Sequence, residues 1–219
     1  MTDSETRCGF VAVIGAPNAG KSTLVNKMVG AKVSIVSPKV QTTRTRVLGI
    51  ALRGDSQIVF IDTPGIFTPR EREKLGQAMV QAAWKSIGDG DVVALIVDSE
   101  KGLTKDTRSI IATLAEKKTP SVLVLNKIDL APRPKLLELS AEANASGAFS
   151  ETFMVSALTG DGVDDFLAYC GDHARPGPWL FPEDQITDMP MRLLAAEVVR
   201  EKLFLQLHQE LPYQLTVET

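Results

Sequence analysis

The chain has 219 residues, of which 44% are apolar and 23% are charged, and its formal net charge at pH 7 is −3. This composition is typical of a packed globular protein, and the charge gives no overall case for nucleic-acid binding. No apolar run reaches the roughly 20 residues of a transmembrane helix, and the start, "MTDSETRCGF", lacks the pattern of a signal peptide, so we expect a cytoplasmic protein. The two cysteines, Cys8 and Cys170, have no CxxC spacing and are expected to be reduced thiols.

Strands and helices are predicted to alternate along most of the chain. Apolar, β-branched runs predict strands at 10–14, 46–52, 57–61, 91–97, 121–126 and 152–156. Helical spacing predicts helices near 21–29, 72–87, 104–117, 133–146 and 162–173. A short turn joins the second and third strands, which should form an antiparallel hairpin. The pattern predicts an α/β fold, with a six-stranded, mostly parallel sheet and helices on both faces.

The stretch between the first strand and the first helix, 15–22, matches the phosphate-binding pattern G-x4-G-K-[ST]. Glycines let the backbone wrap closely around an anion, and the helix N-terminus adds partial positive charge. Lys21 would reach the β- and γ-phosphates of a nucleotide, and the hydroxyl of Ser22 would ligate Mg²⁺. The candidate contacts in this stretch are Gly15, Pro17, Asn18, Ala19, Gly20, Lys21, Ser22 and Thr23. An ordinary strand-to-helix turn is the alternative.

No acidic residue occurs from 6 to 54, although this segment carries several lysines and arginines. A solvated basic face and a segment wrapped around a polyanion are both consistent with that pattern. Thr42 and Thr43 lie within it, between the first helix and the second strand. A threonine there can complete the coordination of Mg²⁺ when a nucleoside triphosphate is bound and release it afterwards. We favour Thr43 over Thr42 as that ligand, and a surface hydroxyl is the alternative.

The third strand ends in the sequence DTPG, 62–65. The carboxylate of Asp62 can hold the Mg²⁺ shell through water, and the N–H of Gly65 is free to meet a γ-phosphate. The following Ile66 cannot hold a water as the glutamine of Ras-like enzymes does, which predicts slow hydrolysis. The candidate catalytic residues are Lys21, Thr43 and Gly65, and the candidate metal ligands are Ser22, Thr43 and Asp62.

The fifth strand is followed directly by NKID, 126–129. The Asp129 carboxylate can accept hydrogen bonds from guanine N1–H and N2–H₂, whereas adenine offers no such pair of donors. A site built on such bonds can discriminate by about 10⁴ or more. The SAL sequence at 156–158 follows the sixth strand and is a candidate loop at the purine edge. The candidate base contacts are Asn126, Lys127, Asp129, Ser156, Ala157 and Leu158.

After His173 the chain becomes rich in proline, and 176–190 is predicted to be an extended linker. We expect Asp188 to cap a helix from about 190 to 209, followed by a strand around 213–217. The helix is expected to have one apolar face, made by Met191, Leu194, Ala195, Val198 and Leu205. One helix and one strand cannot bury a core of their own. We therefore expect this tail to be disordered or to lie against the first domain or a neighbouring molecule.

The nucleotide motifs end by about residue 158, so loss of the tail should leave GTP binding nearly intact.

The order of G-x4-GKS, Thr-Thr, DTPG, NKID and SAL resembles that of a translation-factor-class GTPase. The segments "GAPNAGKSTLVNKMVG", "VSPKVQTTRTRVLGI" and "FIDTPGI" resemble the Era family of ribosome-assembly GTPases. The segment "RLLAAEVVREKLFLQLHQELPYQLTVE" resembles the beginning of that family's C-terminal KH domain. The resemblance implies a G domain over 7–175, a linker over 176–190 and the start of a KH domain over 191–219.

The same resemblance implies a molecular switch that binds and hydrolyses GTP with Mg²⁺ in small-subunit assembly and 16S rRNA maturation. The family's KH domain binds the 3′ end of 16S rRNA, and peripheral association with the inner membrane is also implied. We expect a monomer. A KH fold continues to a GxxG loop that clamps the RNA backbone, and no such loop follows the predicted helix in this sequence. RNA binding is therefore expected of a longer protein.

The resemblance also bears on Asn18, which matches an asparagine that helps to hold K⁺ beside the β- and γ-phosphates in related GTPases. A turn residue that tolerates positive φ is an equally weighted alternative.

Three other functions are alternatives. A nucleotide-dependent binding switch with incidental hydrolysis is favoured by Ile66. A small-molecule P-loop kinase would need an arginine-rich lid and would leave NKID without a role. A paralogous tRNA-modification or tandem-domain GTPase is disfavoured by the resemblance of 192–218 to the start of a KH domain.

Overall fold

The computed structural model of the chain describes residues 6–37, 42–43, 45–69, 73–207 and 217. Its strands are β1 (Arg7–Ile14), β2 (Val47–Arg53), β3 (Ser56–Asp62), β4 (Val92–Asp98), β5 (Ser121–Asn126), β6 (Phe149–Met154) and the short β7 (Arg175–Pro176). Its α-helices are α1 (Lys21–Val29), α2 (Lys74–Ile87), α3 (Lys105–Glu116), α4 (Arg133–Asn144), α5 (Val163–Asp172) and α6 (Met191–Gln206), and a 3₁₀ turn, η1, spans Ile128–Leu130.

The strands form one sheet in the order β2-β3-β1-β4-β5-β6. The β2–β3 hairpin is antiparallel, and the pairs β1–β3, β1–β4, β4–β5 and β5–β6 are parallel. This confirms the predicted α/β fold with a mostly parallel sheet. In such a sheet the carboxyl ends of the parallel strands lie at one edge, where ligands bind. The loops that follow β1, β3, β4, β5 and β6 therefore meet at that edge.

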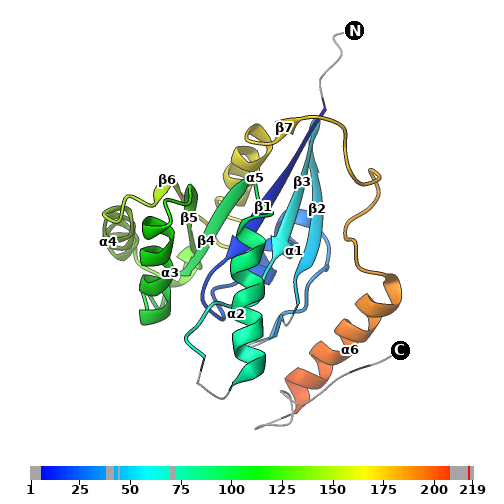
Figure 1. Cartoon of the computed structure of the whole chain (residues 1–219), viewed down its shortest axis with the longest axis horizontal. Coiled ribbons are helices and arrows are strands. Elements are labelled where there is room, and N and C mark those ends of the chain that lie inside the picture. The colour runs from blue at the N-terminus through cyan, green and yellow to red at the C-terminus, as the bar shows by residue number, and fades with distance from the viewer. Residues whose placement is uncertain (1–5, 38–41, 44, 70–72, 208–216, 218–219) are drawn as a thin grey trace.

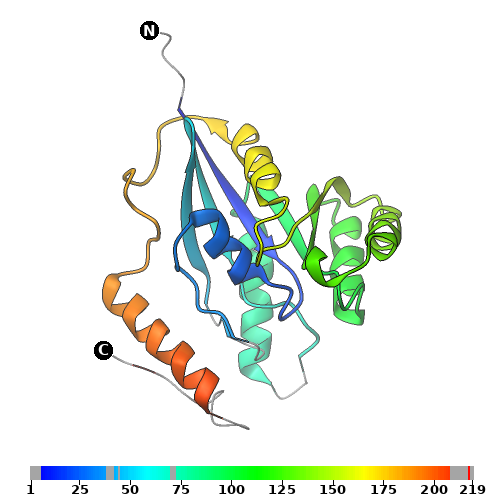
Figure 2. The same ribbon diagram turned by 180° about the vertical axis from the view of Figure 1, so that it is seen from behind.

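Alternate residues along each central strand face opposite sides of the sheet, as strand geometry requires. In β1, Val11 and Val13 join one buried cluster with side chains of α1 and α5, whereas Ala12 and Ile14 join a second cluster with side chains of α2, α3 and α4. Figure 1 shows α2 and α3 in front of the sheet, and Figure 2 shows α1 and α5 in front of its other face. Among the helices that the structure describes, none combines the length and apolar character needed to cross a bilayer.

Three details of the strands differ from the prediction. The first strand was expected at 10–14 but begins three residues earlier, at Arg7. The sixth strand was expected at 152–156 but spans Phe149–Met154. It is the edge strand of the sheet, and it includes exposed residues such as Ser150 and Glu151. A prediction from apolar residues alone therefore placed the start of the strand too late. The seventh strand, β7, was not predicted because a two-residue pairing with β1 has no periodicity of its own.

The linker after β7 is bound to the sheet. The side chain of Gln57 in β3 accepts hydrogen bonds from the backbone N–H groups of Leu180 and Phe181 and donates one to the carbonyl of Phe181. The N–H of Ile50 in β2 donates to the carbonyl of Ile186 over 2.9 Å. These bonds place the linker along the hairpin and bring α6 beside β2, as both views show (Figures 1 and 2).

The start of α6 also differs from the prediction. Pro190 occupies the N-cap position without a side-chain cap, and the N–H of Leu194 donates to its carbonyl. A capping side chain must come from the N-cap residue itself, so Asp188 is two residues too early and is exposed.

The prediction of which face of α6 is buried was wrong as well. Met191, Ala195 and Leu205 are exposed, while the buried residues of the helix are Ala196, Arg200, Glu201 and Phe204. The helix therefore packs through a face that carries two charged residues. The strand expected at 213–217 falls almost entirely outside the described residues.

Candidate nucleotide-binding site

The loop between β1 and α1 has two positions where only glycine fits. Gly15 has a φ of +149°, and a Cβ there would lie 2.3 Å from the carbonyl oxygen of Ile96. Gly20 has a φ of +91°, and a Cβ there would lie 2.3 Å from Nδ2 of Asn126. L side chains rarely adopt such backbone angles. The loop is thus closely packed against the ends of β4 and β5, with the N-terminus of α1 directed at its centre.

Lys21, the first residue of α1, is buried beneath this loop. Its ammonium donates to the carbonyl oxygens of Gly15 (3.1 Å) and Ala16 (3.0 Å). Burial lowers the pKa of Lys21 from its ordinary value to about 8, and the negative charge of Asp62 opposes that shift. The helix has no acidic residue in its first turn and no side-chain N-cap. Its N–H groups and this lysine form a positive environment suited to phosphate.

Three oxygen-bearing side chains meet beside Lys21. The hydroxyl of Ser22 donates to Oδ2 of Asp62 over 2.6 Å and lies 3.0 Å from Oγ1 of Thr43. Burial raises the pKa of Asp62, and the hydrogen bond from Ser22 and the charge of Lys21 oppose that rise. These three are the metal ligands expected from the sequence, and the structure brings them together.

The same cluster fits a hard cation. Hydroxyl and carboxylate oxygens are the ligands that Mg²⁺ takes in proteins. Within the described part of the chain, the second carboxylate oxygen of Asp62, Oδ1, is buried without a hydrogen-bond partner, and buried polar atoms are normally satisfied. A cation with its water shell would satisfy this oxygen. Thr42 is directed elsewhere, because its hydroxyl lies 2.6 Å from that of Ser37, so the geometry favours Thr43.

The DTPG segment lies against the phosphate loop. A Cβ on Gly65 would lie 2.8 Å from the Cα of Pro17, and the N–H of Ile66 donates to the carbonyl of Gly15 over 3.0 Å. Only glycine allows this close approach of the two loops. The side chain of Ile66 is 5% exposed and belongs to the buried cluster with α2, α3 and α4, so it offers no polar group to a water at the site.

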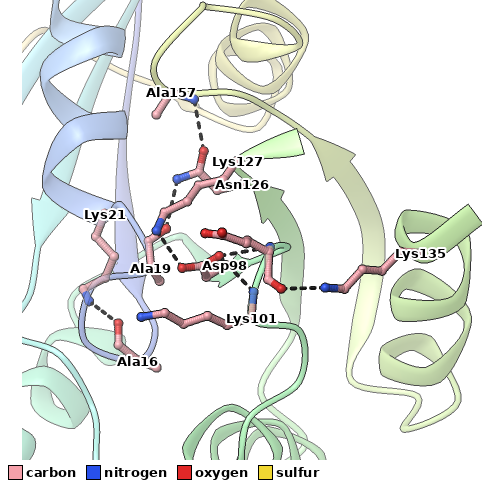
Figure 3. A network of polar contacts seen from close by, with 10 residues as sticks. Ala16, Ala19, Lys21, Asp98, Lys101, Asn126, Lys127, Lys135 and Ala157 are labelled. Carbon is pink, nitrogen blue, oxygen red and sulfur yellow. Dashed lines mark hydrogen bonds and ion pairs between the residues drawn. The ribbon is translucent and has the colours of Figure 1, made fainter. Parts of the chain in front are cut away.

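The NKID and SAL loops are joined by Asn126, which is buried (Figure 3). Its Nδ2 donates to the carbonyl of Ala19 over 2.9 Å, and its Oδ1 accepts the N–H of Ala157 at 3.0 Å. One side chain thus ties the phosphate loop to both expected base loops. Lys127 follows with a φ of +63°, and its ammonium pairs with Asp98 at 2.6 Å.

The remaining expected base contacts differ in exposure. Asp129 lies in η1 and is exposed, as is Leu158, whereas Ser156 is buried. The hydroxyl of Ser156 accepts the N–H of Thr159 over 3.1 Å and shapes the turn of the SAL loop. A carboxylate that is exposed at the rim of the site is free to meet a base that enters from solvent.

A cavity of about 450 Å³ lies over the phosphate loop, within the range of small-molecule sites. Ten of the expected residues line it: Pro17, Asn18, Gly20, Lys21, Ser22, Thr23, Thr42, Thr43, Gly65 and Lys127. The others are not part of that lining: Gly15, Ala19, Asp62, Asn126, Asp129, Ser156, Ala157 and Leu158.

Residues after β4 also belong to the site, and sequence reasoning missed them. Glu100 and Lys101 line the cavity, and Figure 3 shows the side chain of Lys101 extending toward Ala16 and Lys21. Asp98, which pairs with Lys127, ends β4. The available signal was topological: β4 lies next to β1, so its carboxyl end had to adjoin the phosphate loop.

The chain is similar to known GTPases in sequence and in structure. The family model described as 50S ribosome-binding GTPase matches residues 10–127. GTPase Era of Rhizobium meliloti (strain 1021) is 59% identical over 214 residues, which cover 98% of this chain and 68% of that protein. A crystal structure of Era in complex with MgGDPNP and nucleotides 1506–1542 of 16S ribosomal RNA has a TM-score of 0.89 at 40% identity, covering 95% of this chain and 70% of that one.

A second solved structure is nearly as similar. A variant of Aquifex aeolicus Era bound to GDP and AlF₄⁻ has a TM-score of 0.87 at 40% identity, covering 94% of this chain and 70% of that one. The fold and the site define a P-loop GTPase. With a relative 59% identical over nearly the whole chain, the chain belongs to the Era family of GTPases.

Proposed function

We propose that this Era-family GTPase binds GTP with Mg²⁺, hydrolyses it slowly, and acts as a switch in small-subunit assembly and 16S rRNA maturation. The observation that carries the chemistry is the cluster of Ser22, Thr43 and Asp62 beside Lys21. The solved Era complex with MgGDPNP and a 16S rRNA fragment supports both the binding of a guanine nucleotide with Mg²⁺ and the role in 16S rRNA maturation.

The chain's own residues supply positioning and charge, which dominate the catalysis of phosphoryl transfer. Lys21 and the N–H groups at the start of α1 hold the β- and γ-phosphates, and the N–H of Gly65 meets the γ-phosphate. Ser22 and Thr43 would ligate Mg²⁺ and Asp62 would hold its water shell; the metal neutralises charge on the phosphates. Asp129 reads the guanine edge, and Asn126 keeps the two base loops in register with the phosphate loop.

A binding switch with incidental hydrolysis is the second candidate: the buried isoleucine after Gly65 favours it, whereas the similarity to GTPase Era and to the Era structure with GDP and AlF₄⁻ favours hydrolysis. Multiple turnover that a ribosomal ligand stimulates would count against it. K⁺ beside Asn18 belongs to the first candidate, since such an ion would supply positive charge near the β- and γ-phosphates. The φ of +62° at Asn18 equally suits a turn residue.

The RNA partner, the oligomeric state and the cellular location are proposed from membership of the Era family. We propose that residues 191–219 begin a KH domain, and that the longer protein binds the 3′ end of 16S rRNA through it. A monomer in the cytoplasm, with peripheral association at the inner membrane, is proposed on the same ground. Cell fractionation and the sedimentation of the purified protein test these two points.

Nucleotide competition and turnover test the central proposal. GTP should displace a labelled GDP far better than ATP does, and phosphate release should require both GTP and Mg²⁺. Asp62→Asn should lower the affinity for Mg²⁺ by about 10–100-fold, the usual cost of disturbing a metal's outer shell, so that phosphate release requires more Mg²⁺. Asp184→Asn, at an exposed carboxylate in the linker, is the matched control. Equal displacement by GTP and ATP would overturn the assignment.

A further inference from the structure

The helix α6 contacts the segment between α1 and β2 through two consecutive residues. Arg200 donates from Nη2 to the carbonyl of Thr42 over 2.8 Å. Glu201 accepts the N–H of Val36 at 2.8 Å with one carboxylate oxygen and pairs with Lys32 through the other. The contacts bridge 158 to 169 positions of sequence.

These two residues are buried, at 4% and 7% exposure. Buried charges are costly unless they are paired and hydrogen-bonded. Glu197, one helical turn before, provides the pairing for Arg200 through hydrogen bonds to its Nε and Nη2. Among the residues that the structure describes, Nη1 of Arg200 is buried without a hydrogen-bond partner, but its Nε and Nη2 and both oxygens of Glu201 are paired. The charged face of α6 is therefore a specific polar contact rather than a surface that merely lies close.

The backbone that α6 holds leads directly to the metal-site threonine. Val36 and Thr42 line the nucleotide cavity. The carbonyl of Thr42 and the N–H of Thr43 belong to one planar peptide group, so the bond from Arg200 restricts the orientation of that plane. Oγ1 of Thr43 then lies 3.0 Å from Ser22 Oγ. A residue of α6 thus influences the position of a proposed Mg²⁺ ligand without touching the nucleotide.

We propose that Arg200 and Glu201 are positioning residues of the nucleotide site. They hold the backbone at Val36 and at Thr42, and the bond to Thr42 orients the neighbouring Thr43 toward the metal, so α6 docking and GTP·Mg²⁺ binding stabilise each other. The inference rests on the proposed function through the role of Thr43. It also argues against the expectation that the tail is dispensable for nucleotide binding.

The coupling is specific to the triphosphate form. Thr43 serves Mg²⁺ when the γ-phosphate is present, whereas the phosphate loop and the base loops hold GDP without it. A coupling free energy between two sites is reciprocal and typically amounts to about 5- to 150-fold in affinity. Removing the contact from Arg200 should therefore weaken a triphosphate analogue by about tenfold and leave GDP within about twofold.

The test compares Arg200→Gln, Arg200→Lys and the control Lys202→Gln, which alters an exposed charge on α6. Affinities for fluorescent GDP and for a non-hydrolysable GTP analogue are measured across a Mg²⁺ titration. Arg200→Gln should shift the triphosphate titration to higher Mg²⁺, Arg200→Lys should restore part of the loss, and Lys202→Gln should match the wild type. Equal losses for both nucleotides, or no loss for either, would overturn the proposal.

Hydrogen exchange on the unaltered chain gives a readout that no folding defect can obscure. The amides of α6 should exchange more slowly with the triphosphate analogue and Mg²⁺ than with GDP. Protection of α6 that is the same with either nucleotide would count against the coupling. If the wild-type chain bound no GTP, the proposed function itself would fail, which is a separate result.

Discussion

The ammonium of Lys127 lies 2.6 Å from the carboxylate of Asp98, whose other oxygen accepts the backbone N–H groups of Glu100 (3.0 Å) and Lys101 (3.2 Å). Asp98 is 6% exposed, whereas the side chain of Lys127 is 28% exposed, so the pair is only partly shielded from water and from salt. It joins the loop after β4 to the NKID loop after β5 (Figure 3). The position of the lysine beside the expected base contacts is therefore set by a neighbouring strand.

Asp98→Asn should weaken GTP and GDP binding to the same extent, because the base side of the site serves both nucleotides. A hydrogen bond to a charged group contributes about 1.5–3 kcal/mol, and we expect a loss of about tenfold. Equilibrium binding of both fluorescent nucleotides measures it, with the exposed Asp188→Asn as control. A loss confined to GTP would show that Asp98 acts on the γ-phosphate side instead.

Asp129→Asn should exchange a preference for guanine for one for xanthine. The amide donates where the carboxylate accepted, and it therefore suits the xanthine C2 carbonyl. Competition of GDP and XDP against a labelled nucleotide checks this, with Asp165→Asn, at an exposed carboxylate of α5, as control. An unchanged base preference in the variant would remove Asp129 from the base site.

The affinity for GTP should depend on pH through Lys21. Burial lowers its pKa to about 8 in the free chain, and phosphate requires the protonated lysine. Affinity should be flat below about pH 7 and fall by up to tenfold per unit above 8, since each pKa unit corresponds to about 1.36 kcal/mol. Calorimetry at pH 8.5 in buffers of different ionisation enthalpy should show proton uptake on binding. Absence of uptake would contradict the lowered pKa.

The same shift affects the stability of the free chain. Because the folded-state pKa of Lys21 lies below its ordinary 10.5, the unfolded chain binds more protons than the folded chain between about pH 8 and 10.5. Its contribution to the free energy of unfolding therefore rises with pH across that window. From about pH 8 to 10.5 the free energy of unfolding of the wild type should increase relative to that of Lys21→Met, which lacks the titrating group. Lys27→Met, at an exposed lysine of α1, is the control variant in the same denaturation series.

Turnover should be slow and faster in K⁺ than in Na⁺. Ile66 offers no polar group to the attacking water, so charge near the phosphates has to come from elsewhere, and a larger cation suits a loose shell of carbonyl and phosphate oxygens. Steady-state phosphate release in matched salts measures this for wild type and Asn18→Ala. If the rates are identical in both salts and the substitution leaves them unchanged, Asn18 is only a turn residue and holds no K⁺.

The sequence by itself determined the sheet, the phosphate loop and most of the residues at the nucleotide site. These features depend on neighbours in the chain: a strand period of two, a glycine where φ must be positive, and motifs placed directly after strands. Once the strands are parallel, their carboxyl ends share one edge, so Lys21, Asp62 and Asn126 had to come together there.

Only the tertiary structure decided which face of α6 is buried and which residues support the site from outside it. The apolar spacing of α6 predicted a buried stripe that includes Met191 and Leu205, yet both are exposed. Arg200 and Glu201 are buried instead, because their partners are backbone groups of Thr42 and Val36, far away in the sequence. The spacing of apolar residues in a helix predicts its apolar face, but it contains no information on the polar groups of another segment that packs against the helix. Such contacts exist only after the linker has placed α6 beside β2.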